Sequence, residues 1–204
     1  MKIPVRIRRW LIFVLGILPV IWLVGGALSQ SLGADPAQTL VHESGFWALR
    51  FLLMTLCVSF GARYFKWSWL MLHRRMLGLF TLFYALLHLL AYYLFILGSD
   101  LHRLGDELLQ RPYIWMGIPA VVILVVLGLT STNGWMRRLK RNWQRLHYLV
   151  YPALLFSWLH LFWQVRSSYQ QAVIYGVIGA VLLGSRVVWM VQKRFRRRLK
   201  KARK

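Results

Sequence analysis

The sequence contains very few acidic residues and a single cysteine. Only 5 of its 204 residues are Asp or Glu, against 27 Lys and Arg, and the formal net charge is +22. One cysteine, Cys57, excludes a disulfide framework or a thiolate metal cluster within one chain. Its place in an apolar run predicts a small buried hydrophobic residue. The chain also lacks a Walker loop, a GxGxxG motif and an HExxH motif, so it carries no recognisable device for binding a nucleotide.

The strong excess of basic residues has two explanations. Basic chains often bind nucleic acid. Here the charge accompanies 58% hydrophobic residues, 11 Trp and 11 Phe, in several apolar runs of about twenty residues that a soluble domain would not expose. No RNA- or DNA-reading motif stands beside the charge, so we expect no nucleic acid partner. The basic residues instead indicate orientation in a membrane and attraction to anionic lipid.

Apolar segments predict an all-α integral membrane bundle of six transmembrane helices. Their expected ranges are 10–29, 44–62, 76–97, 113–131, 147–164 and 171–191. The basic opening and first apolar segment resemble a signal peptide, but the segment is longer than the usual signal core, and we interpret it as a retained anchor. The expected organisation is a cytoplasmic N-terminus (1–9), a transmembrane domain (10–191) and a basic cytoplasmic tail (192–204).

The distribution of charge predicts the topology of these segments. Of the 27 basic residues, 22 fall before the first segment, in the second and fourth connections, or in the tail. The acidic residues all fall in the first or third connection: Asp35, Glu43, Asp100, Asp106 and Glu107. By the positive-inside rule, we expect six spans with both termini in the cytoplasm.

The third connection, GSDLHRLGDELLQRP, is expected to form an amphipathic turn of helix on the outer surface. His102 lies in this connection, and we interpret it as a solvated surface residue. His42, at the outer end of the second segment, has the same interpretation.

Histidines inside the apolar segments are the candidate functional residues. An imidazole in hydrocarbon is costly, so an ionisable residue within a span is a hypothesis of function. His88 and His160 are expected at comparable depth on the third and fifth helices, where two neutral imidazoles can approach one heme iron from opposite sides. No Asp or Glu lies within a span, so these histidines lack the partners of a proton relay. We therefore predict that both are heme ligands.

Three further residues are candidates whose alternatives stay open. His147 is expected at the inner edge of the fifth helix, as a heme ligand or an interfacial residue, and His73 is the other histidine near that face. An ideal helix would place His147 and His160 about 220° apart in rotation, so presenting both on one face requires a kink, for example at Pro152. Arg50, inside the outer end of the second helix, either pairs with a heme propionate or extends to the headgroups.

Two long stretches resemble the ferric-reductase-like transmembrane superfamily. They are HRRMLGLFTLFYALLHLLAYY in the third segment and NGWMRRLKRNWQRLHYLVYPALLFSWLH leading into the fifth. With six spans and a basic tail, the resemblance covers essentially the whole chain. It implies that His88, His147 and His160 match the heme ligands of the family, whereas the role of His73 stays open. Unlike the eukaryotic oxidase relatives, the sequence has no flavin- or nicotinamide-binding domain, so an external electron donor is expected.

The resemblance implies an electron-transfer subunit of the bacterial inner membrane. Family members of this kind take electrons at the inner face, from the quinone pool or a cytoplasmic flavin reductase, and pass them through b-type heme to a periplasmic molybdopterin subunit. That subunit reduces methionine sulfoxide in oxidised proteins, so substrate chemistry is expected in the partner. One or two hemes are implied, and flavin mononucleotide is associated with the family. The alternatives are a stand-alone transmembrane ferric or quinone reductase, and a heme-free scaffold or transporter.

Overall fold

The computed structural model describes residues 4–165 and 168–202. Every regular element within these ranges is helical. In chain order the elements are α1 (Val5–Leu28), α2 (Pro36–Tyr64), η1 (Ser68–Leu72), α3 (Arg74–Ala91), η2 (Tyr92–Ile96), η3 (Leu101–Arg103), α4 (Leu104–Gln110), α5 (Ile114–Leu129), α6 (Asn133–Leu139), α7 (Arg141–Leu146), η4 (His147–Leu149), α8 (Val150–Gln164) and α9 (Gln170–Ala202). The predicted all-α fold is confirmed.

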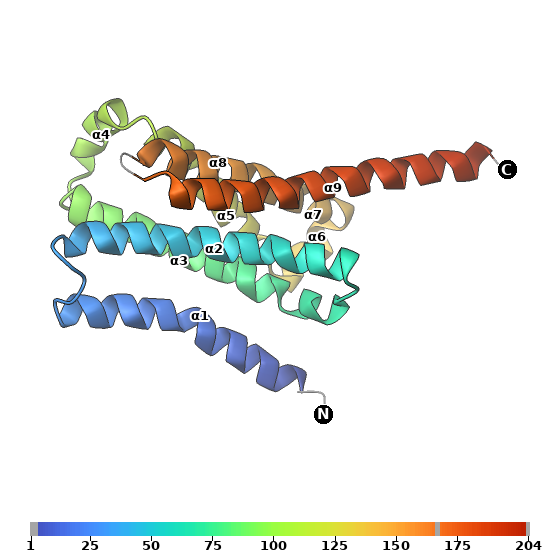
Figure 1. Ribbon diagram of the computed structural model, residues 1–204, viewed down its shortest axis with the longest axis horizontal. Coiled ribbons are helices and arrows are strands. Elements are labelled where there is room, and N and C mark those ends of the chain that lie inside the picture. The colour runs from blue at the N-terminus through green and yellow to red at the C-terminus, as the bar shows by residue number, and fades with distance from the viewer. Residues whose placement is uncertain (1–3, 166–167, 203–204) are drawn as a thin grey trace.

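The long helices run side by side along one axis, with both ends of the chain at the same end of the bundle (Figure 1). The α1–α2 connection and α4 lie at the opposite end. Helix α3 packs mainly on α2, and α8 packs mainly on α5, while α9 contacts both α2 and α8. The six predicted apolar segments thus correspond to α1, α2, α3 with η2, α5, η4 with α8, and α9.

The helices differ in their ability to cross a bilayer. Four described stretches are long and apolar enough to span one: Val5–Leu28, Pro36–Tyr64, Arg74–Ile96 and Gln170–Arg196. Helix α5 counts as a fifth only if it forms one span with α6, to which it is bent by 94°. Helix α8 has 15 residues, short of the roughly twenty that cross the hydrocarbon. The chain is a membrane protein, whereas six spans and cytoplasmic termini stay predictions.

A core of leucines and small residues holds α2, α5 and α8 together. Leu52, Leu124 and Leu154 are buried in this cluster, and Ala153 is fully buried. A second cluster joins α3 to α2 through the stacked rings of Phe51 and Tyr84, whose centroids are 5.3 Å apart. Aromatic stacks of this kind fix the rotation of one helix against the next, because ring geometry is specific where aliphatic contact is not.

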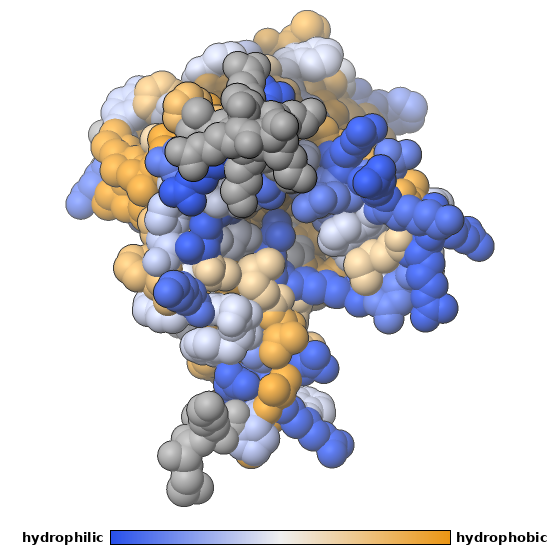
Figure 2. Space-filling model, turned by 90° about the vertical axis from the view of Figure 1, so that its right-hand side faces the viewer, coloured by the Kyte–Doolittle hydropathy of each residue, from blue (hydrophilic) through white to orange (hydrophobic). Residues whose placement is uncertain are grey.

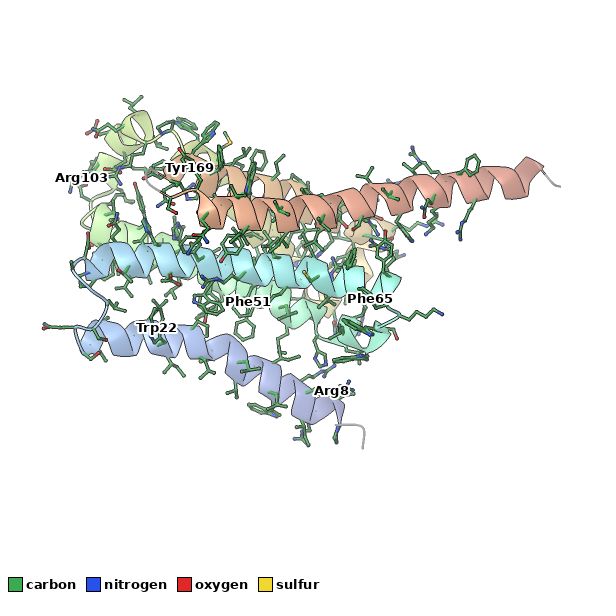
Figure 3. The ribbon with its side chains drawn as sticks, viewed as in Figure 1. Arg8, Trp22, Phe51, Phe65, Arg103 and Tyr169 are labelled. Atoms are coloured by element: carbon green, nitrogen blue, oxygen red, sulfur yellow. The ribbon has the colours of Figure 1, made fainter. Side chains whose placement is uncertain are left out.

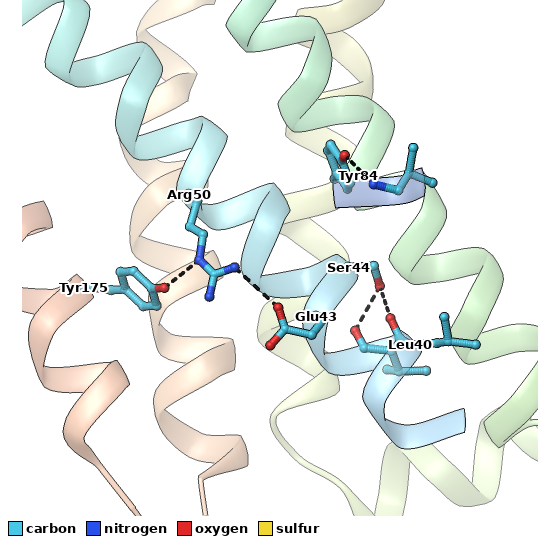
Figure 4. A network of polar contacts seen from close by, with 8 residues as sticks. Leu40, Glu43, Ser44, Arg50, Tyr84 and Tyr175 are labelled. Atoms are coloured by element: carbon cyan, nitrogen blue, oxygen red, sulfur yellow. Dashed lines mark hydrogen bonds and ion pairs between the residues drawn. The ribbon is translucent and has the colours of Figure 1, made fainter. Parts of the chain in front are cut away.

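Tyr84 also fastens α1 to α3. Its hydroxyl donates to the Gly16 carbonyl at 2.7 Å and accepts from the Val20 amide at 3.1 Å, and Figure 4 shows the second of these bonds. Gly16 and Val20 are four residues apart in α1, so the hydroxyl stands where an ordinary helical hydrogen bond would lie. Pro19, within the same turn, has no amide hydrogen to donate. The inserted Tyr84 hydroxyl and Pro19 are both recognised causes of bending, so this turn is where a bend in α1 is expected.

Local signals in the sequence set where several helices begin. Asp35 caps α2 by accepting from the Gln38 amide at 2.9 Å, and Pro36 occupies the first helical position. The helical turn predicted in the third connection is present as η3 and α4, and His102 is exposed there as expected. Lys140, with φ of +46°, turns the chain sharply between α6 and α7.

Two predictions about single side chains are wrong. Cys57 is exposed on α2 instead of buried, because a membrane helix is apolar on all sides and its hydropathy does not reveal which face meets the core. His42 is not a solvated surface residue, since it is part-buried and its Nε2 accepts from the Gln164 side-chain amide of α8 at 2.7 Å.

Candidate metal centre

His88 of α3 and His160 of α8 meet inside the bundle. Their ring centroids lie 6.1 Å apart, with the ring planes at 85°. The two helices themselves pack only weakly on each other in the described part of the chain, because each is held against its own partner, α2 or α5. The structure therefore brings together the two histidines that the sequence placed at comparable depth. Their side chains approach each other across the space between α3 and α8.

Each of these imidazoles is oriented by a backbone carbonyl. His88 Nδ1 lies 2.7 Å from the Val41 carbonyl oxygen, and His160 Nδ1 lies 2.8 Å from that of Tyr113. A carbonyl can only accept, so in both rings Nδ1 must carry the proton. In a neutral imidazole the lone pair is then on Nε2, which is the atom free to bind a metal.

A glycine beside each histidine makes room for the ring. A Cβ placed on Gly45 of α2 would come within 3.0 Å of His88 Nδ1, and one on Gly117 of α5 within 2.9 Å of His160 Nδ1. A contact as close as the one at Gly117 essentially does not occur for real side chains, and the one at Gly45 is tighter than nearly all of them, so a larger residue would shift the ring, more at Gly117 than at Gly45. These glycines are required by close approach of a neighbouring helix, not by backbone conformation.

The two halves of this arrangement repeat along the chain. The carbonyl, the glycine and the histidine of the first half (41, 45 and 88) recur 72 residues later as 113, 117 and 160. In both halves 47 residues separate the histidine from the residue whose carbonyl it binds. Sequence reasoning missed all four supporting residues, Val41, Gly45, Tyr113 and Gly117. The common 72-residue spacing of Gly45 to Gly117 and His88 to His160 is the signal that would have found them.

The residues present fit an iron held by two axial imidazoles. Two metal–nitrogen bonds of about 2.0–2.1 Å, added to the distance from each nitrogen to its ring centre, would place the centroids a little over 6 Å apart, close to the 6.1 Å observed. Both rings have Nδ1 satisfied and Nε2 free. Axial ligation by His is one of the established ways in which proteins hold heme iron.

His147 lies outside this pair, in the short helix η4 before α8. Its Nε2 is 3.4 Å from the Thr130 hydroxyl, and its ring stacks on Trp143 with centroids 4.0 Å apart. Because α8 begins only at Val150, His147 and His160 do not share one continuous α-helix. The condition under which the sequence required a kink at Pro152, one helix presenting both histidines on one face, is therefore not met.

His73 is buried at the end of the bundle that holds the termini. It is 1% exposed, and neither ring nitrogen has a hydrogen-bond partner among the described residues. Burial lowers the pKa of His73, and the nearby Arg8 and Arg9 lower it further. Its ring neighbour is Trp69, and no ring contact joins it to His147 in the described ranges. The structure therefore does not assemble a second histidine pair from these residues.

Arg50 is already engaged by protein groups. Its Nη1 is 3.4 Å from Glu43 Oε2, and its Nε donates to the Tyr175 hydroxyl at 2.9 Å (Figure 4). Its guanidinium also lies over the Trp47 ring, 4.7 Å from the centroid. These contacts account for an arginine in a membrane helix without any ligand, because each one stabilises the charge.

Comparison with known proteins gives a consistent result. Residues 44–158 match the family model described as "Ferric reductase like transmembrane component". This range contains His88 and His147 and ends just before His160. No solved structure matches the chain.

Curated relatives resemble the chain over nearly its whole length. A protein-methionine-sulfoxide reductase heme-binding subunit MsrQ of Xanthomonas oryzae pv. oryzae is 44% identical over 183 residues, which are 90% of this chain and 82% of the relative. One from Xanthomonas euvesicatoria pv. vesicatoria is 46% identical, over 81% of this chain and 76% of the relative. One from Herminiimonas arsenicoxydans is 40% identical, over 90% of this chain and 86% of the relative.

Proposed function

The chain belongs to the family of protein-methionine-sulfoxide reductase heme-binding subunits, within the ferric reductase-like transmembrane components, and on that premise we propose that it is a b-type heme subunit carrying electrons across the bacterial inner membrane. The observation that supports this most directly is the His88–His160 pair, with centroids 6.1 Å apart and both Nδ1 atoms bound to carbonyls. The alternative of a heme-free scaffold gives no reason for two half-buried imidazoles with matched supports.

The protein's own residues hold and tune the iron. The carbonyls of Val41 and Tyr113 fix each ring and, by accepting a hydrogen bond from Nδ1–H, make the opposite nitrogen a stronger ligand. Gly45 and Gly117 let α2 and α5 approach the rings closely, which limits the space for water. When bound, heme supplies one-electron Fe(III)/Fe(II) chemistry, whose potential depends on axial ligands and burial.

The position of the pair suits delivery of electrons to the outer face. Val41 lies in the second turn of α2 and Tyr113 immediately precedes α5, so the pair lies toward the end of the bundle opposite the termini. With cytoplasmic termini, that end faces the periplasm. We propose that the acceptor there is a molybdopterin-containing methionine-sulfoxide reductase that repairs oxidised proteins, and that substrate chemistry takes place in that partner.

The inner face is the proposed side of electron uptake. The donor is the quinone pool or a cytoplasmic flavin reductase, as the family resemblance implies. His147 and its neighbours lie toward that end, so His147 is the candidate for an additional heme ligand or a conducting residue. A flavin mononucleotide at this face and an Arg50–propionate contact remain predictions. Release of flavin fluorescence on denaturing the purified protein tests the first.

Reconstitution tests this function. The purified protein in proteoliposomes, reduced by quinol or by a flavin reductase with NADH, should be reoxidised when the oxidised periplasmic subunit and methionine sulfoxide are added. His160→Ala should abolish this exchange, whereas Gly184→Ala, where an added Cβ meets nothing within 4 Å, should retain it. Reoxidation by ferric chelates alone, with none by the partner subunit, would instead establish a stand-alone reductase.

A further inference from the structure

Three polar nitrogens at the end of the bundle with the termini are buried and have no hydrogen-bond partner among the described residues. They are Nε of Arg8 and both ring nitrogens of His73. The Arg8 guanidinium carbon lies 5.1 Å from the centroid of the Trp69 ring, and that ring stands edge-on to His73 at 6.4 Å. Arg8, Trp69 and His73 form what we call the Arg8 cluster, where the first turn of α1 meets η1 and α3 (Figure 3).

No acidic side chain of the protein is placed to neutralise this cluster. All five acidic residues of the sequence lie in or next to the α1–α2 and α3–α5 connections, at the opposite end of the bundle. Arg9 adds a second positive charge close to His73. Figure 2 looks onto this end and shows hydrophilic side chains gathered there. A partly buried guanidinium without an anion is unfavourable, so an acceptor from outside the chain would stabilise the cluster.

A hollow with an apolar floor and a basic rim adjoins the cluster. It has a volume of about 260 Å³ and is lined by Arg6, Arg9, Trp10 and Phe13 of α1 and by Met76 of α3. None of the three cluster residues lines the hollow, but Met76 follows His73 by about one helical turn and Arg9 is the next residue after Arg8, so the hollow lies beside the cluster. The hollow is open to the outside of the bundle, where Trp10 and Phe13 are both exposed.

We propose that the Arg8 cluster binds the phosphate of an anionic phospholipid, with an acyl chain lying in the adjoining hollow. Phosphate oxygens are acceptors that match the unpartnered Arg8 Nε–H and the one N–H that a neutral His73 ring carries, and guanidinium–phosphate contacts are among the stronger charge-assisted hydrogen bonds. A ligand with a neutral headgroup leaves the charge of Arg8 and Arg9 unmatched. A small free anion leaves the apolar floor of the hollow uncovered.

Such a lipid has a structural consequence for α1. Tyr84 fastens α1 to α3 near the middle of the helix, whereas the cluster and the hollow lie at its basic end. The bound lipid thus forms a second connection between these helices and holds the first helix against the bundle.

Thermal unfolding of the full protein in non-ionic detergent, followed by tryptophan fluorescence, tests the site. Dioleoylphosphatidylglycerol at about ten times its dissociation constant should raise the midpoint by about 3–5 °C, with a smaller shift for dioleoylphosphatidylcholine and none for inorganic phosphate. The difference between the two lipids should disappear in Arg8→Gln and His73→Phe. It should persist in Arg141→Gln, a matched loss of charge at an exposed residue at the start of α7.

Two results of the unfolding experiment would contradict the proposal. An equal response of wild type and both cluster variants to phosphatidylglycerol would overturn the site, and a full shift with inorganic phosphate alone would overturn the lipid as its ligand. Native mass spectrometry of wild type gives a readout that does not depend on variant folding. It should show phosphatidylglycerol retained in preference to phosphatidylcholine, and equal retention would contradict the proposal.

Discussion

His88 and His160 lie with ring centroids 6.1 Å apart although they belong to α3 and α8, helices that pack only weakly on each other. Each ring is instead held from the side by the neighbouring helix, through a carbonyl and a glycine. The geometry of the pair thus depends on the packing of α2 with α3 and of α5 with α8. Changes in α2 or α5 should therefore alter the metal centre without touching a ligand.

Gly117→Ala is a change in α5 that should alter the metal centre without replacing a ligand. The new Cβ would approach His160 Nδ1 to 2.9 Å, which displaces the ring from the Tyr113 carbonyl. Loss of a partner that orients a metal ligand typically lowers metal affinity by about 10-fold or more. We expect a reduced heme-to-protein ratio in titrations of purified protein, with a smaller effect for Gly45→Ala.

A matched glycine controls for the general effect of adding a methyl group. A Cβ placed on Gly184 of α9 would meet nothing within 4 Å, so Gly184→Ala should leave heme affinity unchanged. Equal heme affinity in Gly117→Ala and Gly184→Ala would show that the close approach of α5 does not position His160.

His147→Ala should leave the heme of the central pair in place. Its ring stacks on Trp143 and lies near Thr130, on an element separate from α8. We expect the low-spin bands of the pair to persist in the visible spectrum of this variant. A fall in the heme-to-protein ratio from two to one, with the remaining bands unchanged, would identify His147 as the ligand of a second heme. Loss of all heme would show that His147 belongs to the pair.

Tyr84→Phe should weaken the attachment of α1. The fully buried hydroxyl serves both the Gly16 carbonyl and the Val20 amide, and its removal deletes both hydrogen bonds between α3 and α1. We expect a loss of about 1–3 kcal/mol in the free energy of unfolding, measured by chemical denaturation in detergent. Tyr93→Phe is the control, because its exposed bond to the Ser99 carbonyl can be replaced by water. An equal effect of both variants would argue against an anchoring role.

Stability should depend on pH through His73. Burial, then Arg8 and Arg9, lower its pKa in the folded protein below the ordinary value of 6.5. As pH falls through 6.5 the unfolded chain takes up a proton that the folded protein resists, so stability decreases between pH 6.5 and the lower folded-state pKa. Above 6.5 this contribution is constant. Melting temperatures between pH 7.5 and 5 in non-ionic detergent without added lipid should fall less in His73→Phe than in wild type.

Much of the architecture could be predicted from hydropathy and charge. Each of the six apolar segments contains a helix, because runs of this length have few other stable forms in a membrane. The ends of the fourth and fifth segments were less predictable. The chain there breaks into the short helices α6, α7 and η4, and the bend between α5 and α6 depends on tertiary packing.

The depth of His88 and His160 in the membrane could be predicted, but the direction in which each side chain points could not. Counting residues from the helix ends placed His88 and His160 at similar depth, whereas the rotation of each helix is set by side-chain packing that hydropathy does not encode. Cys57 was misplaced for the same reason. The supporting glycines were accessible in principle, since Gly45 and Gly117 share the 72-residue repeat of the histidines.

The most direct test is the reduced-minus-oxidised visible spectrum, with heme content, of detergent-purified wild type, His88→Ala and His160→Ala. Wild type should show sharp low-spin b-type bands, because two imidazoles are strong axial ligands. Either substitution should remove the heme of the pair: all heme if the wild-type ratio is one, half if it is two. A colourless wild type after heme-sufficient expression, or bands unaffected by both substitutions, would contradict heme ligation by His88 and His160.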